Sequence, residues 1–132
     1  MERTMGVRGY KPFAPLTDAE ERQGVSDVLC AAFEGGSNYW MSAIRKAPGD
    51  QPPTDYLSEL PSAGGTVVVV EDRTEEGEKP LGHRLSYAKA LRGCKEAADF
   101  LGLSLRAFFD DHDANSADIA LQFAVLEEVV YG

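Results

Sequence analysis

The residues from Glu34 to Trp40 have the types and spacing best suited to ligand binding. Two consecutive glycines let backbone amides approach a bound molecule closely, and Ser37 and Asn38 add hydrogen-bonding side chains beside them. Tyr39 and Trp40 follow with flat faces on which a base or another ring can stack. The segment therefore predicts a site for a small nucleotide-like or aromatic ligand. The candidate ligand-binding residues are Glu34, Gly35, Gly36, Ser37, Asn38, Tyr39 and Trp40.

The same segment also has a purely structural interpretation, which the sequence leaves open. The glycines can end one helix, Ser37 or Asn38 can cap the next, and Trp40 can anchor the core. A phosphate loop is excluded because no Gly-Lys-Ser/Thr sequence follows the glycines.

A second dense group of chemically capable residues is Asp110-Asp111-His112-Asp113. Carboxylates beside a histidine can hold a divalent ion or exchange protons. The EF-hand spacing is absent, however, and Asp is common where helices end and chains turn. We therefore expect a solvated turn and no metal site. His83, the other histidine, has no evident partner and is expected to be an exposed strand residue.

No catalytic residues are predicted. A Ser-His-Asp arrangement would require Ser86 or Ser104 to meet His83 or His112, and no nucleophile-elbow pattern supports it. An enzyme, in the form of a small hydrolase, is therefore the third function that we consider, behind two kinds of binding protein.

The charge balance bears on the partner. The chain has 132 residues with 13 Lys and Arg against 22 Asp and Glu, a formal net charge of −9. This argues against direct nucleic-acid binding, which clustered Lys and Arg carry. The acidic run Glu71, Asp72, Glu75, Glu76 and Glu78 predicts a soluble hairpin tip or a mimic of nucleic-acid phosphates.

The sequence indicates a protein of the cytoplasm. Residues 1–15 lack the apolar region of a secretory signal, and the longest apolar run, residues 67–70, is too short to cross a membrane. Cys30 and Cys94 fall on apolar faces of expected helices, where buried thiols are inert. Neither a disulfide scaffold nor a zinc spacing is present, and we expect no cofactor.

The elements that must position these residues follow from caps, periodicity and β-branched runs. Thr17 and Glu20 form a capping box that begins a helix ending at Gly35-Gly36. The further expected elements are a short helix over about 38–46, an ordered loop over 48–65 with a helical turn near 55–60, a β-hairpin over about 66–72 and 81–85, a helix capped by Ser86 and closed by Leu101-Gly102, a short helix over 104–111, and a last helix capped by Asn115 or Ser116.

These elements predict an α+β fold: one mostly helical domain over 17–132 with a small antiparallel β-hairpin, preceded by an extension over 1–16. In the helix that begins at Ser86, Tyr87, Leu91, Cys94, Ala98 and Leu101 are expected to form the apolar stripe. In the last helix the expected stripe is Ile119, Phe123, Leu126 and Val130, widened by Leu121, Ala124 and Val125. A stripe this wide predicts burial on more than one side, so we expect a homodimer or larger homo-oligomer formed through this helix.

Two stretches resemble a family of small uncharacterised proteins from bacteriophages and prophages. Residues 33–40 are similar to the family's LEGGxxYW segment, and residues 117–122 with 128–132 are similar to its closing AD…LQ…GE.VYG segment. The order of the intervening elements is also similar, whereas Glu127 stands where the family pattern has glycine. The resemblance implies phage origin and an accessory role in the infected cell, with no activity to carry over.

We therefore expect a non-enzymatic phage accessory protein of the host cytoplasm that binds a small nucleotide-like or aromatic ligand in a counter-defence or host-takeover role. The alternative is an acidic inhibitor or nucleic-acid mimic that acts on a host protein through the hairpin and the Asp110–Asp113 turn.

Overall fold

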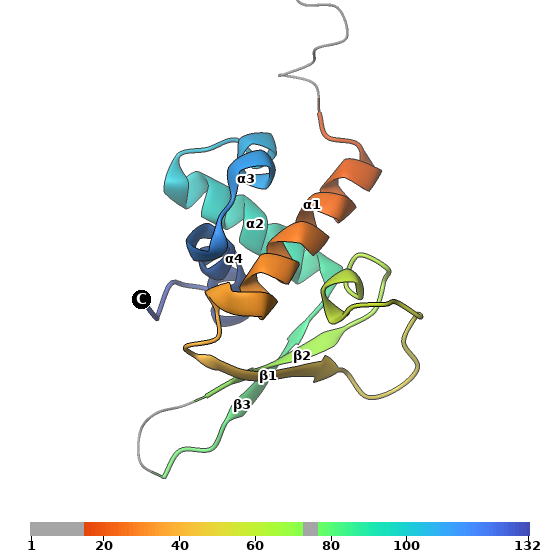
Figure 1. Cartoon of the computed structure of the whole chain (residues 1–132), viewed down its shortest axis with the longest axis vertical. Helices are drawn as coiled ribbons and strands as arrows, with labels where there is room; N and C mark the ends of the chain where they lie inside the picture. Colours follow the sequence, from red (N-terminus) through yellow and green to blue (C-terminus); the bar gives the residue numbers. More distant parts are fainter. Residues whose placement is uncertain (1–14, 73–76) are drawn as a thin grey trace, which may run out of the picture.

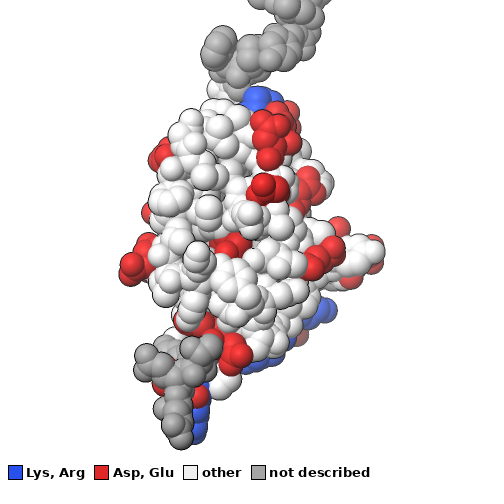
Figure 2. All heavy atoms as spheres, turned by 60° about the vertical axis from the view of Figure 1, so that its left-hand side comes forward, with Lys and Arg blue, Asp and Glu red and all other residues white. Residues whose placement is uncertain are grey.

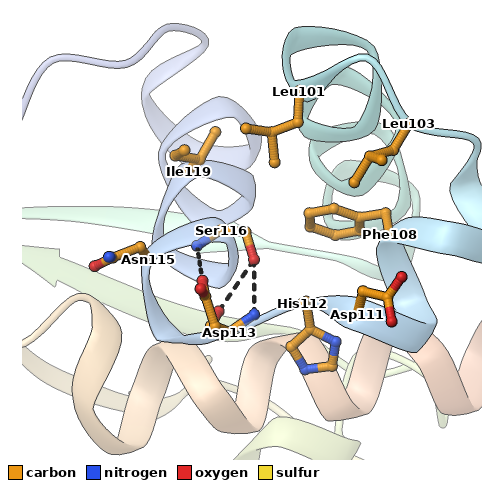
Figure 3. Close-up of a pocket in the computed structure, with 9 residues that line it drawn as sticks. All are labelled: Leu101, Leu103, Phe108, Asp111, His112, Asp113, Asn115, Ser116 and Ile119. Carbon is orange, nitrogen blue, oxygen red and sulfur yellow. Dashed lines mark hydrogen bonds between the residues drawn. The ribbon is translucent and has the colours of Figure 1, made fainter.

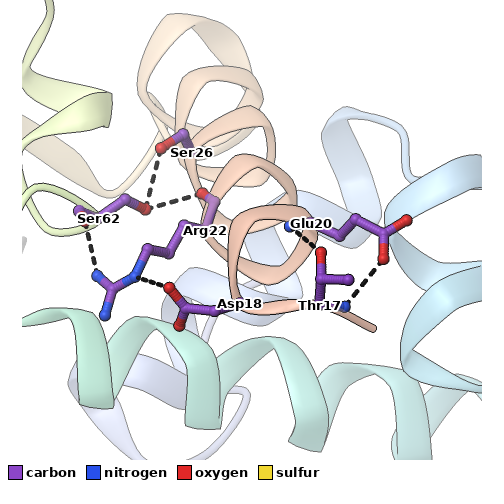
Figure 4. Close-up of polar contacts among 6 residues, drawn as sticks. All are labelled: Thr17, Asp18, Glu20, Arg22, Ser26 and Ser62. Atoms are coloured by element: carbon purple, nitrogen blue, oxygen red, sulfur yellow. Dashed lines mark hydrogen bonds and ion pairs between the residues drawn. The ribbon is translucent and has the colours of Figure 1, made fainter. Parts of the chain in front are cut away.

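The fold begins with α1 (Asp18–Ala31), whose start is the one that the sequence predicts. The computed structural model describes residues 15–72 and 77–132. The Thr17 hydroxyl accepts from the Glu20 amide at 3.1 Å and the Glu20 carboxylate accepts from the Thr17 amide at 2.9 Å, so the capping box is confirmed (Figure 4). One wider turn, η1 (Ala32–Gly36), extends α1 to the glycine pair.

Three antiparallel strands form one sheet in the order β1-β2-β3, with one face covered by helices (Figure 1). The strands are β1 (Met41–Lys46), β2 (Val67–Glu71) and β3 (Leu81–Leu85). The expected β-hairpin is thus confirmed, and the α+β class with it. Every residue of β2 is buried: Val67 and Val69 belong to the main core, and Val68 and Val70 form a second small cluster with Ala47.

The expectation of a short helix over about 38–46 is wrong, because residues 41–46 form β1 and the residues just before them form a turn. Its apolar residues have helical spacing, but the edge of β2 offers backbone pairing from Met41 opposite Glu71 to Lys46 opposite Val67, with one irregularity between Met41 and Ala43. Pairing with a buried strand overrides the local helical preference. A tight turn, closed by the Met41 amide on the Ser37 carbonyl at 2.9 Å, redirects the chain into the strand.

The remaining helices are α2 (Tyr87–Leu101), α3 (Leu105–Asp111) and α4 (Ala114–Leu126), with a short turn η2 (Leu57–Glu59) in the long loop. Ser86 caps α2 and Gly102 closes it in the left-handed conformation at φ 73°, as expected. The cap of α4 is Asp113 rather than Asn115 or Ser116, and Ser116 completes the box from the third helical position.

The expected stripes are confirmed in part, since Cys94, Ala98, Leu121 and Ala124 are buried and most of their other members pack against the core. Small residues bring α2 and α4 close together and add buried positions that the stripes did not include. A Cβ atom on Gly93 would lie 2.4 Å from the Ala120 carbonyl oxygen. The buried positions are Ala90, Gly93, Cys94, Ala97 and Ala98 in α2, and Ala117, Asp118, Ala120, Leu121, Gln122 and Ala124 in α4. Leu101 is instead exposed, Ile119, Phe123 and Leu126 are half-buried, and Val130 lies beyond the end of α4. Close backbone approach selects small residues here, which apolar periodicity does not reveal.

α1 is also fixed to the loop that follows η2 (Figure 4). The Arg22 guanidinium donates to the Ser62 carbonyl at 2.7 Å, and the Ser62 hydroxyl donates to the Arg22 carbonyl at 2.8 Å. Ser26 adds a hydroxyl contact to Ser62 at 3.0 Å. None of the helices in the described parts of the chain is both long enough and apolar enough to cross a membrane.

Candidate functional site

The Asp118 carboxylate is the centre of the main polar cluster. Asp118 lies on the inner side of α4 and is 6% exposed. Its Oδ1 accepts from the Ser37 hydroxyl at 2.8 Å and from the Trp40 indole N–H at 2.7 Å. Its Oδ2 accepts from the Tyr39 hydroxyl at 2.5 Å and from the Gln122 amide at 2.9 Å. A buried carboxylate is stable in a fold when donors replace its water in this way.

Three of the seven predicted site residues thus meet a carboxylate of the same chain. Ser37 is fully buried and Trp40 is 1% exposed, so neither presents its polar group to solvent. Tyr39 differs, because 57% of the residue is exposed while its hydroxyl faces Asp118. Desolvation of the phenolic oxygen and the hydrogen bond to Asp118 raise the pKa of Tyr39 to about 12.

The other four predicted site residues lie at or near the surface. Gly36 sits where η1 approaches α4, and a Cβ atom there would lie 2.3 Å from the Ala114 carbonyl oxygen. A Cβ atom on Gly35 would meet nothing within 4 Å. Asn38 is exposed, and the Glu34 carboxylate accepts from the Cys30 thiol at 3.2 Å. Gly36 is therefore required for close approach rather than for a left-handed turn.

The segment after α4 covers the ring of Trp40. Tyr131 stacks on it with ring centroids 5.6 Å apart and planes 6° from parallel. The Tyr131 hydroxyl donates to Glu71 at the end of β2, and Gln122 bonds the backbone around Tyr131. Sequence patterns did not indicate the roles of Gln122, Tyr131 and Glu71. For Gln122 a signal was present in α4, where Asp118 and Gln122 stand four residues apart in a stretch, residues 117–126, that is otherwise apolar.

The expectation that His83 is exposed and without a partner is wrong. Its Nε2 lies 2.9 Å from Glu71 Oε1, and its side chain is 18% exposed. Glu71 itself is 9% exposed, so it does not belong to a solvated hairpin tip. The β2–β3 register places His83 opposite Val69, two positions from Glu71, which hairpin periodicity alone does not reveal. Glu75 and Glu76 of the acidic run lie outside the described residues.

The Asp110–Asp113 turn borders a separate cavity of about 360 Å³ between α4 and the α2–α3 corner (Figure 3). Leu101, Leu103, Phe108 and Ile119 form its apolar walls. Asp111, His112, Asp113, Asn115 and Ser116 line its polar side.

The polar groups at this turn mostly serve the fold. The hydrogen bond that the Ser116 amide donates to the Asp113 carboxylate is the main cause that lowers the pKa of Asp113, as expected for a helix cap. His112 Nδ1 lies 3.0 Å from the Phe109 carbonyl oxygen. In the described chain, no three His, Cys, Asp or Glu side chains are grouped so that they could hold a metal ion.

The two cysteines differ in their surroundings. Cys94 is buried as expected, and desolvation raises the pKa of its thiol to about 12. Cys30 was expected on an apolar face but is only partly buried. The hydrogen bond to Glu34 raises the pKa of the Cys30 thiol, so both thiols are held in the unreactive protonated form.

Comparison with protein-family models, curated proteins and solved structures gives no match.

Proposed function

We propose that this protein is a non-enzymatic binding protein whose partner is a protein segment with a large apolar side chain flanked by basic residues. The cavity at the Asp110–Asp113 turn carries the proposal. It joins apolar walls to a carboxylate-bearing side, and its lining contains no Lys or Arg. A segment that offers an apolar anchor and positive charge complements both parts.

The size of the cavity favours a side chain over a large cofactor. Pockets for small molecules range from about 300 to 1,000 Å³, and this one, at about 360 Å³, is near the lower limit. It is half-open, with Leu101 and Leu103 each 39% exposed at its edge. One or two large side chains can fill such a cavity and leave their backbone at the surface.

The apolar surface continues beyond the cavity. We call Phe100, Leu103, Ile119 and Phe123 the α2–α4 face; Phe100 is 61% exposed and meets Phe123 edge to face at 5.7 Å. Figure 2 shows that uncharged residues cover most of this side of the molecule, with Asp and Glu scattered over it and Lys and Arg only towards its two ends. Exposed large apolar side chains such as Phe100 and Leu103, with acidic residues around them, are typical of a protein-binding surface.

This proposal develops the acidic-inhibitor alternative and not the aromatic-ligand expectation. Tyr131 occupies the ring face of Trp40, and Asp118 engages the donors of Ser37, Tyr39 and Trp40. The resemblance to phage proteins makes a protein of the host cell the expected source of the partner.

Selection from a library of random twelve-residue peptides tests the proposal. We expect enriched peptides to share a large apolar residue next to Lys or Arg. Their affinity should fall steeply between about 50 and 500 mM salt, because the charge contribution is screened. Leu103→Ser should weaken binding by about tenfold or more, as expected for removal of an anchoring contact.

Leu81→Ser is the matched control, since Leu81 on β3 is 40% exposed and Leu103 is 39% exposed. The proposal fails if no peptide is enriched, or if enriched peptides bind the Leu103→Ser variant as tightly as the parent protein. Sedimentation of the protein alone tests the expected homo-oligomer. A dimer that Leu103→Ser abolishes would assign the α2–α4 face to a second copy of the chain and not to a foreign partner.

A further inference from the structure

The outer face of the sheet, on the side of Val68 and away from the main core, carries two arginines in one cross-strand row. Val68 of β2 lies opposite Arg45 of β1 and opposite Arg84 of β3. Residues that lie opposite one another on antiparallel strands have their side chains on the same face. Neighbouring strands are about 4.8 Å apart, so the Cα atoms of the two arginines are about 10 Å apart. Both side chains can therefore reach one ligand.

The next row of the same face consists of small residues. Ala43 and Gly82 lie opposite Val70. A Cβ atom on Gly82 would lie 3.0 Å from Val68 Cγ1 and 4.0 Å from Arg45 Nη2, so the Arg45 guanidinium extends across β2 towards β3. A long charged side chain covers apolar surface in this way while its head stays in water. The guanidinium lies on the face and remains exposed.

The two arginines of this row are not neutralised by the fold. Within the residues that the structure describes, neither Arg45 nor Arg84 forms an ion pair with Asp or Glu. The described helices differ, because each of their arginines pairs with a carboxylate: Arg22 with Asp18, Arg92 with Glu96 and Arg106 with Glu20. The guanidinium groups of the sheet are thus available to a ligand.

The sheet is a basic part of an acidic chain. The net charge is −9, yet the strands carry Arg45, Lys46 and Arg84. Their one carboxylate, Glu71, is 9% exposed and bonded to His83. A guanidinium binds a carboxylate or a phosphate through two parallel hydrogen bonds. The charge of this face therefore complements an anionic ligand.

Two features favour an acidic polypeptide over a nucleic acid. The three strands contain no Phe, Tyr or Trp on which a base could stack. Asp72 directly follows β2 and Glu78 precedes β3, and together with the net charge they repel a long polyanion. A short acidic segment needs only the two arginines.

We propose that the outer face of the sheet, at the row of Arg45, Val68 and Arg84, binds a short, extended acidic segment of a partner protein. Alternate residues of an extended chain lie about 7 Å apart on one side, so Asp or Glu at alternate positions meet both guanidinium groups. The site is separate from the cavity at the Asp110–Asp113 turn and does not rest on the function proposed above.

The probe is a fluorescein-labelled peptide with alternate glutamates, SESESESES, and its binding to the full chain is followed by anisotropy. We expect saturable binding at about 50 mM salt and a steep fall in affinity towards about 500 mM, because the charges are then screened. The matched neutral peptide SQSQSQSQS should bind at least about tenfold more weakly.

Arg45→Gln and Arg84→Gln should each weaken binding of SESESESES about fivefold or more, since each removes one guanidinium. Lys95→Gln is the matched control, because it removes the same charge from an exposed position of α2 and should change the affinity less than about twofold. Melting curves check the fold of each variant. Arg84→Gln decides the test if Arg45→Gln lowers the melting temperature, because the Arg45 side chain also lies across β2.

Four results would overturn the proposal. The first is the absence of saturable SESESESES binding at low salt, and the second is an equal loss of affinity in Lys95→Gln and Arg84→Gln. The third is tighter binding of a twelve-nucleotide oligothymidylate than of the peptide, which would assign the face to a phosphate backbone. The fourth is self-association in sedimentation that Arg84→Gln abolishes, which would assign the face to a second copy of the chain.

Discussion

At the residue scale, hydrogen bonds to Asp118 take up the side-chain donors of the predicted site segment, those of Ser37, Tyr39 and Trp40. These three partners of Asp118 lie 81, 79 and 78 positions earlier in the chain. The buried Asp118 carboxylate is stable because each of its two oxygens accepts two hydrogen bonds. The buried donors of Ser37 and Trp40 in turn need these oxygens as acceptors. The cluster therefore joins η1 and the start of β1 to α4.

Asp118→Ala should lower the free energy of unfolding by about 3 kcal/mol or more, because it leaves the buried Ser37 and Trp40 donors unsatisfied. Urea unfolding followed by circular dichroism measures the change. Asp50→Ala is the control, since Asp50 is exposed and should alter the stability by less than about 0.5 kcal/mol. Equal effects of the two substitutions would show that the Asp118 cluster does not stabilise the fold.

The pKa of Tyr39 predicts a loss of stability in alkali. A tyrosine has a pKa near 10 when unfolded, whereas that of Tyr39 in the fold is raised to about 12. Its contribution is therefore complete below pH 10 and is lost as the pH rises through 12. The difference in melting temperature between the parent protein and Tyr39→Phe should shrink over this window. A difference that stays constant from pH 9 to 12 would contradict the assignment.

At the element scale, caps and β-branched runs were predictable because they are local. The caps formed by Thr17 with Glu20 and by Ser86 depend only on residues nearby in sequence, and so does the strand preference of the β2 valines. β1 was not predictable in this way, since only the edge of β2 makes it a strand. The small-residue contact between α2 and α4 and the hydrogen bonds of Gln122 to the segment after α4 likewise depend on which elements meet. The sequence indicates Trp40 as a ligand-binding residue or a core anchor, but its partners Asp118 and Tyr131 are remote in sequence and could not be predicted.

Gly36 lies at the close approach of η1 to α4, and its neighbour Gly35 provides a matched control. Gly36→Ala places a Cβ atom against the Ala114 carbonyl oxygen and should destabilise the protein by about 1–3 kcal/mol. Gly35→Ala meets open space and should change the stability by less than about 0.5 kcal/mol. Thermal unfolding of both variants distinguishes them, and equal melting temperatures would contradict the close approach.

Glu127 is the one residue other than glycine with positive φ in the described chain. Glycine adopts this conformation at no steric cost. Glu127→Gly should therefore stabilise the protein by about 1 kcal/mol in urea unfolding. Glu128→Gly serves as the control and should bring no gain. A destabilised Glu127→Gly variant would argue that the glutamate side chain itself has a role.

At the scale of the whole molecule, α4 connects the buried polar cluster to the candidate binding surface. Asp118 and Gln122 bond Tyr39 and the backbone of Tyr131, while Ile119 and Phe123 belong to the α2–α4 face. These pairs are one residue apart in sequence, so they lie about 100° apart around the same helix. One rigid element thus positions both the cluster and the face.

Removal of metal ions should leave the molecule unchanged. The carboxylates of the described residues serve as caps, as partners of donors or as surface charges, and none is grouped with two others as metal ligands would be. The melting temperature should be the same before and after dialysis against a chelator. A fall of several degrees that calcium or zinc reverses would assign a metal to the protein.

The burial of Trp40 also determines how this protein behaves in ultraviolet light. The sequence contains a single tryptophan, so all indole emission comes from this one ring. That ring is shielded from water, lies parallel to a tyrosine and donates its N–H to a carboxylate. Both neighbours come from the last fifteen residues, so the emission reports whether the two halves of the chain have come together. The fluorescence of Trp40 therefore reports the contact between the turn that precedes β1 and the residues that follow α4.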